Sequence, residues 1–208
     1  MSLNTYISKQ FADPKGFGGG IVSLVMNRQN RPLYNETIRL LSLSDSDSVL
    51  DIGCGNGFVL NLLAQRHNTT FSGIDPSKEI IETAERRNHK YVKSKKMSFT
   101  CQDVSSLSFP DESFSNVYTI NTVYFWGDLE TPMREVWRVL KPGGCFINML
   151  YTNETLSRFS HTQFGYTRYM AEDLLAAGEN AGFSVKAVPI LHGTAICYIY
   201  TKPTNGVI

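Results

Sequence analysis

The sequence predicts an α/β fold in which helices cover a doubly wound, mainly parallel sheet. Short apolar runs of strand length alternate with longer segments of helical apolar spacing, the order typical of parallel βαβ units. The first run ends in glycines at alternate positions and opens directly onto a helical segment. The runs predicted as strands are Val49–Ile52, Thr70–Asp75, Met97–Cys101, Asn116–Asn121, Cys145–Leu150, Val185–Leu191 and Ala195–Thr201.

The glycine-rich turn after the first run is the most informative motif of the chain. Asp51 stands two residues before the first glycine, and the turn has the spacing G-x-G-x-G. Glycines at a strand end let the backbone bend tightly and approach a ligand without Cβ atoms in the way. The pattern predicts a nucleoside cofactor site, and the alternative is a turn that binds nothing. The predicted site comprises Asp51, Gly53, Cys54, Gly55, Asn56 and Gly57.

A second acidic residue, Asp75, closes the next apolar run and is therefore expected at the tip of the neighbouring strand. A carboxylate at this point can accept two hydrogen bonds from the vicinal hydroxyls of a ribose. We predict that Asp75 binds a ribose, with Pro76 beside it. The alternative is a helix cap, since Asp75 or Ser77 suits the N-terminus of the segment that follows.

Two further features follow in the order expected of repeated βαβ units. The third run leads into Asp103 and Val104 at the start of a polar loop, where an aspartate commonly forms a local turn. After a helical segment, Lys141–Gly144 reads as a turn that ends the helix and starts the fifth run.

Taken together, these motifs resemble the class I S-adenosylmethionine-dependent methyltransferases. The dinucleotide fingerprint G-x-G-x-x-G differs, because its third glycine comes one place later. The resemblance implies a Rossmann-like, seven-stranded sheet whose last strand is antiparallel. It also implies that Asp103 accepts a hydrogen bond from the adenine amino group and that the backbone amide of Val104 donates to the ring.

For the reaction, the resemblance implies direct displacement of a methyl group from a sulfonium, with nucleophile, methyl and sulfur held in line. The leaving thioether is neutral and needs no acid, and only a nucleophile that must lose a proton needs a base. The backbone carbonyl of Asn121, at the end of the fourth run, suits the ammonium group of the cofactor. No metal is expected, and no catalytic residue is assigned.

The predicted substrate site lies beside Asn121. Tyr124, Phe125 and Trp126 would form the wall of an apolar or aromatic pocket, although at least one of them is expected to pack beneath the next helix. His192 is assigned to this site as well. His161 and His192 are candidate bases, but a lone histidine is more often structural.

We predict residues 1–45 as a helical cap and 46–208 as the methyltransferase domain, the two forming one structural unit. Phe11–Gly20 is rich in glycine and resembles a hinge, and Ile21–Met26 is apolar on nearly every side. This segment is predicted either to open and close over the cleft or to pack permanently on the sheet. A dimer or membrane-surface contact is the third option. Asn30–Leu43 is expected to be an amphipathic helix.

Composition agrees with one compact enzyme domain. The chain has 208 residues, of which 42% are hydrophobic, and its formal charge of +1 gives no basic footprint for nucleic acid. Its four cysteines are dispersed without a C-x-x-C pair, which argues against a zinc site or a disulfide framework and favours a reducing, cytoplasmic setting. No membrane span or signal peptide is expected. The chain is expected to be a monomer or a homodimer.

The predicted function is methyl transfer to a small molecule, in the broad branch that includes ubiquinone and menaquinone biosynthesis enzymes. No D/N-P-P-Y segment follows the fourth run, which argues against methylation of exocyclic amines of nucleic acid bases. The alternatives are an RNA or protein methyltransferase and a protein that binds S-adenosylmethionine without turnover. A nicotinamide-dependent oxidoreductase would need the other glycine spacing.

Overall fold

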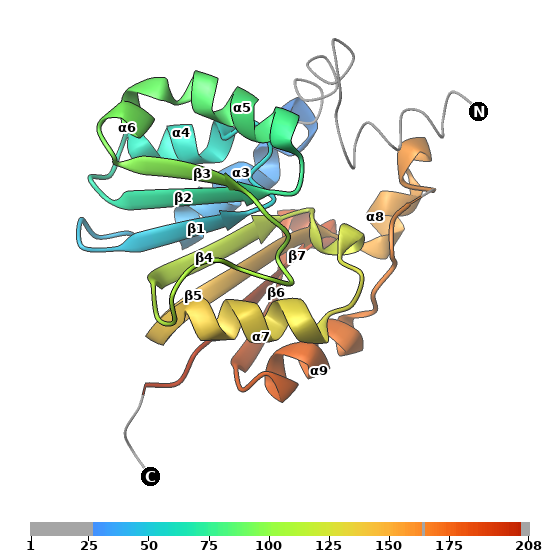
Figure 1. The fold of residues 1–208 in the computed structure, drawn as a ribbon. Coiled ribbons are helices and arrows are strands. Elements are labelled where there is room, and N and C mark those ends of the chain that lie inside the picture. The colour runs from blue at the N-terminus through green and yellow to red at the C-terminus, as the bar shows by residue number, and fades with distance from the viewer. Residues whose placement is uncertain (1–26, 164, 205–208) are drawn as a thin grey trace.

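The computed structural model describes residues 27–163 and 165–204, and for His161 and Gln163 it describes the backbone alone. Three layers form the structure, with a central sheet between two groups of helices (Figure 1). The strands are β1 (Ser48–Ile52), β2 (Thr70–Asp75), β3 (Met97–Cys101), β4 (Phe114–Ile120), β5 (Leu140–Tyr151), β6 (Ser184–Ile190) and β7 (Ala195–Thr201). The helices are α3 (Arg31–Leu40), α4 (Phe58–Ala64), α5 (Lys78–Arg87), α6 (His89–Lys93), α7 (Glu130–Val139), α8 (Asn153–Ser157) and α9 (Ala171–Asn180). Short 3-10 turns are η1 (Val123–Phe125), η2 (Ser160–Gln163) and η3 (Leu191–Gly193).

The seven strands form one sheet in the order β3-β2-β1-β4-β5-β7-β6. Neighbouring strands from β3 through β5 run parallel, whereas β7 is antiparallel to both β5 and β6. The prediction of a seven-stranded, mainly parallel sheet with an antiparallel last strand is confirmed. Strand order reverses between β1 and β4, and open α/β sheets bind their ligands beside such a reversal.

Helices cover both faces of the sheet, as the doubly wound prediction requires. In Figure 1, α4, α5 and α6 lie on one side, whereas α7 and α9 lie on the other. The face of α3 that meets the sheet consists of Leu33, Thr37 and the following Leu41, all of them buried. The described part of the N-terminal segment therefore shares its core with the sheet. The predicted hinge at 11–20 and the apolar segment 21–26 lie outside the described residues.

Three strands have the bounds that the apolar runs predict, namely β2, β3 and β7. β5 differs, because it begins at Leu140 and includes Lys141–Gly144, which the sequence indicates as a turn. Leu140 pairs with Phe114 before the register shifts, and Gly143 adopts a φ of +77° within the irregular stretch. The predicted turn is thus an irregularity inside a strand pair. Its backbone is held by the amide of Gly143, which donates to the carbonyl of Lys202 at 2.8 Å.

The connection between β6 and β7 is the turn η3. Leu191, His192 and Gly193 all have positive φ values, and the amide of Thr194 donates to the carbonyl of Leu191 at 3.2 Å. The carbonyl of Thr194 accepts in turn from the hydroxyl of Thr155 in α8 at 2.8 Å. This tight turn therefore joins the end of the sheet to α8.

Lys202 follows the last strand, and its side chain caps the C-terminus of helix α7. Its side chain is only 3% exposed, and its ammonium donates to the carbonyls of Trp137 and Leu140 at 3.0 and 2.7 Å. The same ammonium lies 3.9 Å from the centroid of the Trp137 ring. A cation at the C-terminus of a helix satisfies carbonyls that have no partner within the helix and interacts favourably with its dipole.

Candidate active site

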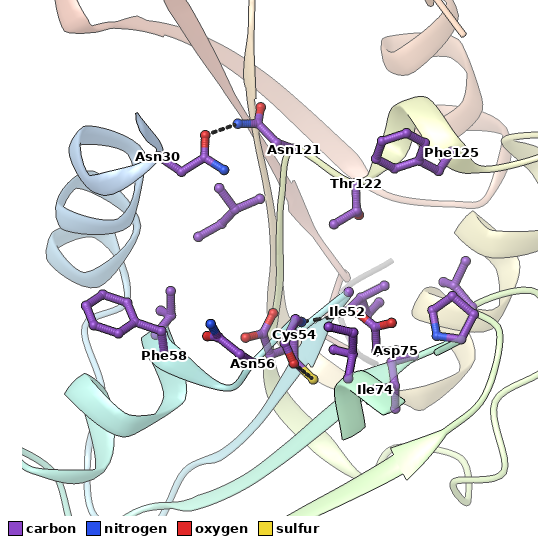
Figure 2. A pocket seen from close by; sticks show the side chains of 18 of the residues that line it. Asn30, Ile52, Cys54, Asn56, Phe58, Ile74, Asp75, Asn121, Thr122 and Phe125 are labelled. Atoms are coloured by element: carbon purple, nitrogen blue, oxygen red, sulfur yellow. Dashed lines mark hydrogen bonds between the residues drawn. The ribbon is translucent and has the colours of Figure 1, made fainter. Parts of the chain in front are cut away.

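A pocket opens where the carboxyl ends of β1, β2 and β4 meet the loop after β3. Figure 2 shows Asn30, at the start of α3, facing Asn121 across the top of this first pocket, with Cys54, Asn56 and Asp75 below. The predicted site residues that line it are Asp51, Gly53, Cys54, Gly55, Asn56, Asp75, Pro76, Asp103, Val104, Asn121, Phe125 and Trp126. The fold thus brings together residues that lie on four separate segments of the sequence.

The glycine turn wraps around the end of β2. The amides of Gly53 and Cys54 both donate to the carbonyl of Ile74 at 2.9 Å. Gly55 has a φ of +51°, and a Cβ atom there would meet nothing within 4 Å. Gly55 therefore leaves open space beside the pocket, as a close approach of a ligand to the backbone requires.

Gly57 has a different role from Gly55. It is buried, does not line the pocket and precedes α4 with a φ of +68°. A Cβ atom at Gly57 would come within 2.5 Å of Asn88 Nδ2 and 2.9 Å of the Phe99 ring. Asn88 donates to the carbonyl of Gly57 at 3.2 Å, so this glycine allows the turn to pack closely against the end of α5.

Asp51 is a buried carboxyl within the pocket, with 4% of its surface exposed. Tyr118, its neighbour across the β1–β4 pair, donates a hydrogen bond to Asp51 Oδ2 at 2.7 Å. Burial raises the pKa of the Asp51 carboxyl to about 8, although the hydrogen bond from Tyr118 lowers it, and the negative charge of Asp75 adds to the rise. A nearby cation favours the ionised form of such a group and would drive off its proton.

Asp75 ties the glycine turn to the start of α5. Its Oδ2 accepts from the amide of Gly55 at 3.2 Å, and its Oδ1 accepts from the amide of Ser77 at 3.0 Å. The side chain of Ser77 makes no capping hydrogen bond. The structure therefore includes the capping contact expected as an alternative for Asp75, and it also places this carboxylate on the pocket wall.

Asp103 and Val104 approach the pocket from the loop after β3. Asp103 Oδ1 accepts from the amide of Ser105 at 2.8 Å, the local turn that the sequence left open as an alternative. The carboxylate thus makes a local turn and lies on the pocket wall at the same time. Val104 is buried, and together with Ile74 and Ile80 it gives this side of the pocket an apolar wall.

Cys54 has the environment of a structural thiol. It is 8% exposed, and burial, together with the charges of Asp51 and Asp75, raises its pKa well above the usual value. A nucleophilic cysteine requires the opposite shift, because the thiolate is the reactive form. Cys54 therefore contributes to the pocket as a wall residue.

Asn121 joins the sheet to the N-terminal helix. It has a φ of +56°, a conformation that asparagine tolerates better than most residues. Its Nδ2 donates to Asn30 Oδ1 at 2.9 Å, and its Oδ1 accepts from the amide of Tyr151 at 3.2 Å. This amide pair closes one side of the pocket (Figure 2).

The sequence prediction missed pocket residues from the segment before the sheet. Asn27, Asn30 and Tyr34 line the pocket, as does Phe58 at the start of α4. The first three stand at i, i+3 and i+7, a spacing that places side chains on one face of a helix and was available in the sequence. Tyr34 and Phe58 pack with their ring centroids 5.9 Å apart. The sequence signal for these pocket residues was the set of polar side chains on one helix face, whereas the prediction considered only the apolar face of the helix.

A second pocket lies beside the first and shares Asn30, Asn121 and Phe125 with it. Tyr124 is 2% exposed, lines this second pocket and donates its hydroxyl to the carbonyl of Tyr151 at 2.9 Å. His192 is exposed in η3 and lines neither pocket. The second pocket is lined by Gln29, Asn30, Asn121, Tyr124, Phe125, Tyr151, Leu156, Phe159, Thr162 and Tyr166.

The first pocket fits the cofactor that the motifs imply. Its apolar wall of Ile74, Ile80 and Val104 suits a flat base, with the carboxylates of Asp75 and Asp103 at its edge. Asparagine side chains at the other end suit the polar groups of an amino acid. Within residues 27–163 and 165–204, no group of three or more His, Cys, Asp or Glu is placed to hold a metal ion. In the same residues, no helix has the length and apolar character needed to cross a bilayer.

Comparison with known proteins supports this interpretation of the pocket. Residues 49–144 match a protein family described as a methyltransferase domain. The uncharacterized methyltransferase YdaC of Bacillus subtilis is 29% identical over 160 residues, which make up 76% of this chain and 85% of YdaC. The sterol 24-C-methyltransferase erg6 of Aspergillus fumigatus is 33% identical over 57% of this chain, but the match spans only 33% of erg6.

Among solved structures, the fold resembles a complex between the Haloferax volcanii Trm112 methyltransferase activator and a methyltransferase described as putative. The TM-score is 0.75 at 21% identity, over 86% of this chain and 92% of the other. At this identity the likeness bears on the fold, whereas the sequence relatives bear on the activity. Fold, pocket and sequence similarity agree that this chain is an S-adenosylmethionine-dependent methyltransferase, with a methyltransferase domain at residues 49–144.

Proposed function

We propose that this enzyme transfers the methyl group of S-adenosylmethionine to a small molecule. The observation that carries the proposal is the pair of adjoining pockets. One is lined by the glycine turn and acids, and the other is small, with aromatic side chains making up half of its lining residues. A compact second pocket suits a small acceptor better than a segment of RNA or protein. The sterol 24-C-methyltransferase relative has a small-molecule acceptor by its name, and we extend that acceptor class to this chain as a proposal.

We propose the following roles for the first pocket. Asp75, with Pro76, binds the ribose hydroxyls, and Asp103 and Val104 bind the adenine edge. Asp51 and the backbone carbonyl of Asn121 face the cationic end of the cofactor. The turn residues Gly53, Cys54, Gly55, Asn56 and Gly57 shape the backbone around it.

The protein's contribution to the reaction is positioning. S-adenosylmethionine supplies an electrophilic methyl group on a sulfonium whose departure as a neutral thioether needs neither an acid nor a metal. Phe125 lines both pockets and Trp126 lines the first, and we propose that these two rings shield the reacting atoms from water. Holding two reactants in line can lower the barrier by about 7 to 11 kcal/mol. We propose a metal-free reaction with no general base unless the acceptor must lose a proton.

Further features are proposed on the sequence arguments given above. We propose a cytoplasmic enzyme, monomeric or homodimeric, in the branch that includes ubiquinone and menaquinone biosynthesis methyltransferases. Residues 1–45 are proposed as a cap on the domain formed by 46–208. His192 is kept as a proposed substrate contact that would require movement of η3, because it now lies outside both pockets.

Calorimetric titration with S-adenosylmethionine and S-adenosylhomocysteine tests the cofactor site. Gly55→Ala and Gly193→Ala form a matched pair, because both glycines have positive φ and open space at the Cβ position. Only Gly55 lines the pocket. We expect Gly55→Ala to weaken binding about tenfold or more and Gly193→Ala to leave it within about twofold, at similar cost to folding.

The acceptor class is tested with labelled methyl donor in two separate pools. We expect label to enter a small-molecule extract and not total RNA or protein. Asp75→Ala should abolish both cofactor binding and incorporation. Incorporation into RNA or protein alone would contradict the small-molecule proposal, and absence of cofactor binding by the folded protein would contradict the cofactor assignment.

A further inference from the structure

The second pocket has a composition that points to a ligand class. Its walls carry the rings of Tyr124, Phe125, Tyr151, Phe159 and Tyr166. Resting on the proposed function, we infer that this pocket is the acceptor subsite and that it takes an uncharged molecule with a flat aromatic ring and one hydroxyl group.

The rings that line the pocket contact one another in two groups. Tyr166 lies against Phe125 with centroids 4.8 Å apart in an edge-on arrangement, and against Tyr124 at 5.5 Å. A second pair of rings, Tyr151 and Phe159, has its centroids 6.0 Å apart. Aromatic rings pair favourably in edge-on and offset geometries, so a further ring bound in this pocket gains contacts of the same kind.

Charge in and around the pocket selects against ions. No charged side chain lines it among the residues that the structure describes. Arg168 does not line the pocket, and its guanidinium donates to the carbonyls of Asn153 and Thr162 and to the hydroxyl of Thr162. Its charge acts on the hydroxyls of Tyr124 and Tyr166, which disfavours a cationic ligand. An anion would gain only this indirect attraction against the full cost of leaving water.

Hydrogen-bonding capacity is limited to a few groups. The hydroxyl of Tyr151 donates to the carbonyl of Gln29 at 2.8 Å, and that of Thr162 donates to the carbonyl of Leu156 at 2.6 Å. Of the polar side chains that line the pocket, only those of Gln29 and Tyr166 have no hydrogen-bond partner within the described residues. Two such groups suit a single hydroxyl, because a buried polar group must be paired.

The second pocket adjoins the first pocket, which is the proposed cofactor site. Asn30, Asn121 and Phe125 belong to both pockets, so a ligand held in the second lies next to the first. In the proposed transfer, a lone pair of the acceptor oxygen forms the new bond to the methyl carbon. The electron pair of the broken carbon–sulfur bond stays on sulfur, and the hydroxyl proton passes to solvent.

The test uses the full chain saturated with S-adenosylhomocysteine and three probes that share one ring. They are 4-methylphenol, 4-methylbenzoate and 4-methylbenzylamine, which are neutral, anionic and cationic at neutral pH. Saturation-transfer NMR and calorimetry measure their binding. We expect the phenol to bind about tenfold tighter or more than either ion, because neither charge has a partner in the pocket.

Two variants and a control locate the binding. Phe159→Ala removes one wall and should weaken binding of 4-methylphenol about fivefold or more. Tyr166→Phe keeps the ring and should reduce the preference for 4-methylphenol over toluene. Tyr91→Ala, on α6 outside both pockets, should change neither. Binding of S-adenosylhomocysteine serves in each variant as the measure of an intact fold.

The outcomes separate this inference from the proposed function. If S-adenosylhomocysteine binds but 4-methylphenol does not, or an ion binds equally well, the inference is wrong. The same holds if Phe159→Ala leaves phenol binding unchanged. If the folded protein fails to bind S-adenosylhomocysteine, the proposed function fails first, whatever the second pocket holds.

Discussion

The carboxyl of Asp51 keeps its proton up to about pH 8 in the folded protein, against an ordinary value of 3.8. Between these values the folded state binds more protons than the unfolded chain, so the free energy of unfolding falls as pH rises. We expect Asp51→Asn, which retains an oxygen to accept from Tyr118, to be about 2–4 kcal/mol more stable than the native protein at pH 8 and nearly equal at pH 4. Urea unfolding at both pH values measures the difference.

The same residue links cofactor affinity to pH. Binding of a cation beside Asp51 favours its carboxylate, so we expect affinity for S-adenosylmethionine to rise with pH up to about 8 and then level off. In Asp51→Asn the affinity should be lower and flat with pH. For the stability prediction, an increase in the free energy of unfolding of Asp51→Asn that is equal at pH 4 and pH 8 would instead point to packing and contradict the role of ionisation.

For single residues, the sequence predicted those site residues whose role follows from their neighbours in the chain. Glycines and acids at strand ends have few other uses in such a pattern, and Asp51, Asp75 and Asp103 all line the pocket. Asn30 could not be predicted to meet Asn121, because the pair is 91 residues apart in the chain and forms only when α3 packs on the sheet. Gly57 shows the converse, since its motif position does not reveal that it packs against Asn88.

Among the elements, α7 holds the loop that carries Asp103. Arg138 donates to the carbonyls of Leu107 and Phe109 at 2.9 and 2.8 Å, and Glu135 accepts from the amide of Leu107 at 2.7 Å. Arg138 also bonds Glu135 within α7 at 2.8 Å. The helix therefore fixes this loop at Leu107 and Phe109.

We expect Arg138→Gln to loosen this loop and to weaken cofactor binding about three- to tenfold. The substitution removes the guanidinium that donates to the carbonyls of Leu107 and Phe109 and to the carboxylate of Glu135. Hydrogen exchange at 103–112 should rise in parallel. Arg134→Gln is the control, since Arg134 pairs with Glu130 on the exposed face of the same helix. Equal effects of the two substitutions would contradict a specific role of Arg138 in holding the loop and point to a general loss of helix stability.

The elements themselves were mostly predictable, for a physical reason. β2, β3 and β7 are apolar runs bounded by polar residues, so their bounds follow from local pattern. The start of β5 was predicted five residues late, at Cys145, because the pairing of Leu140 with Phe114 is set by tertiary contacts while Lys141–Gly144 has turn chemistry. The second pocket could not be predicted as a unit, because its rings come from β5, η1 and the segment after α8.

At the scale of the whole molecule, α3 and the sheet share one core, and the described residues should unfold together. We expect a single calorimetric transition. S-adenosylhomocysteine at about 100 times its dissociation constant should add about 2.7 kcal/mol to the free energy of unfolding and raise Tm by about 5–10 °C. Two resolved transitions would show that the N-terminal segment folds separately, and binding without a shift in Tm would contradict coupling of the pocket to the core.

The place of β7 in the sheet constrains how the protein is made. β7 follows β5 and β6 in the chain, yet it lies between them and is the hydrogen-bonded neighbour that joins them. As the chain leaves the ribosome, β5 therefore keeps an open edge, and β6 has no place in the sheet, until β7 has emerged. An open edge on a buried strand is a template for pairing with other chains. We therefore expect a stalled or prematurely terminated nascent chain that lacks β7 to bind chaperones or to aggregate.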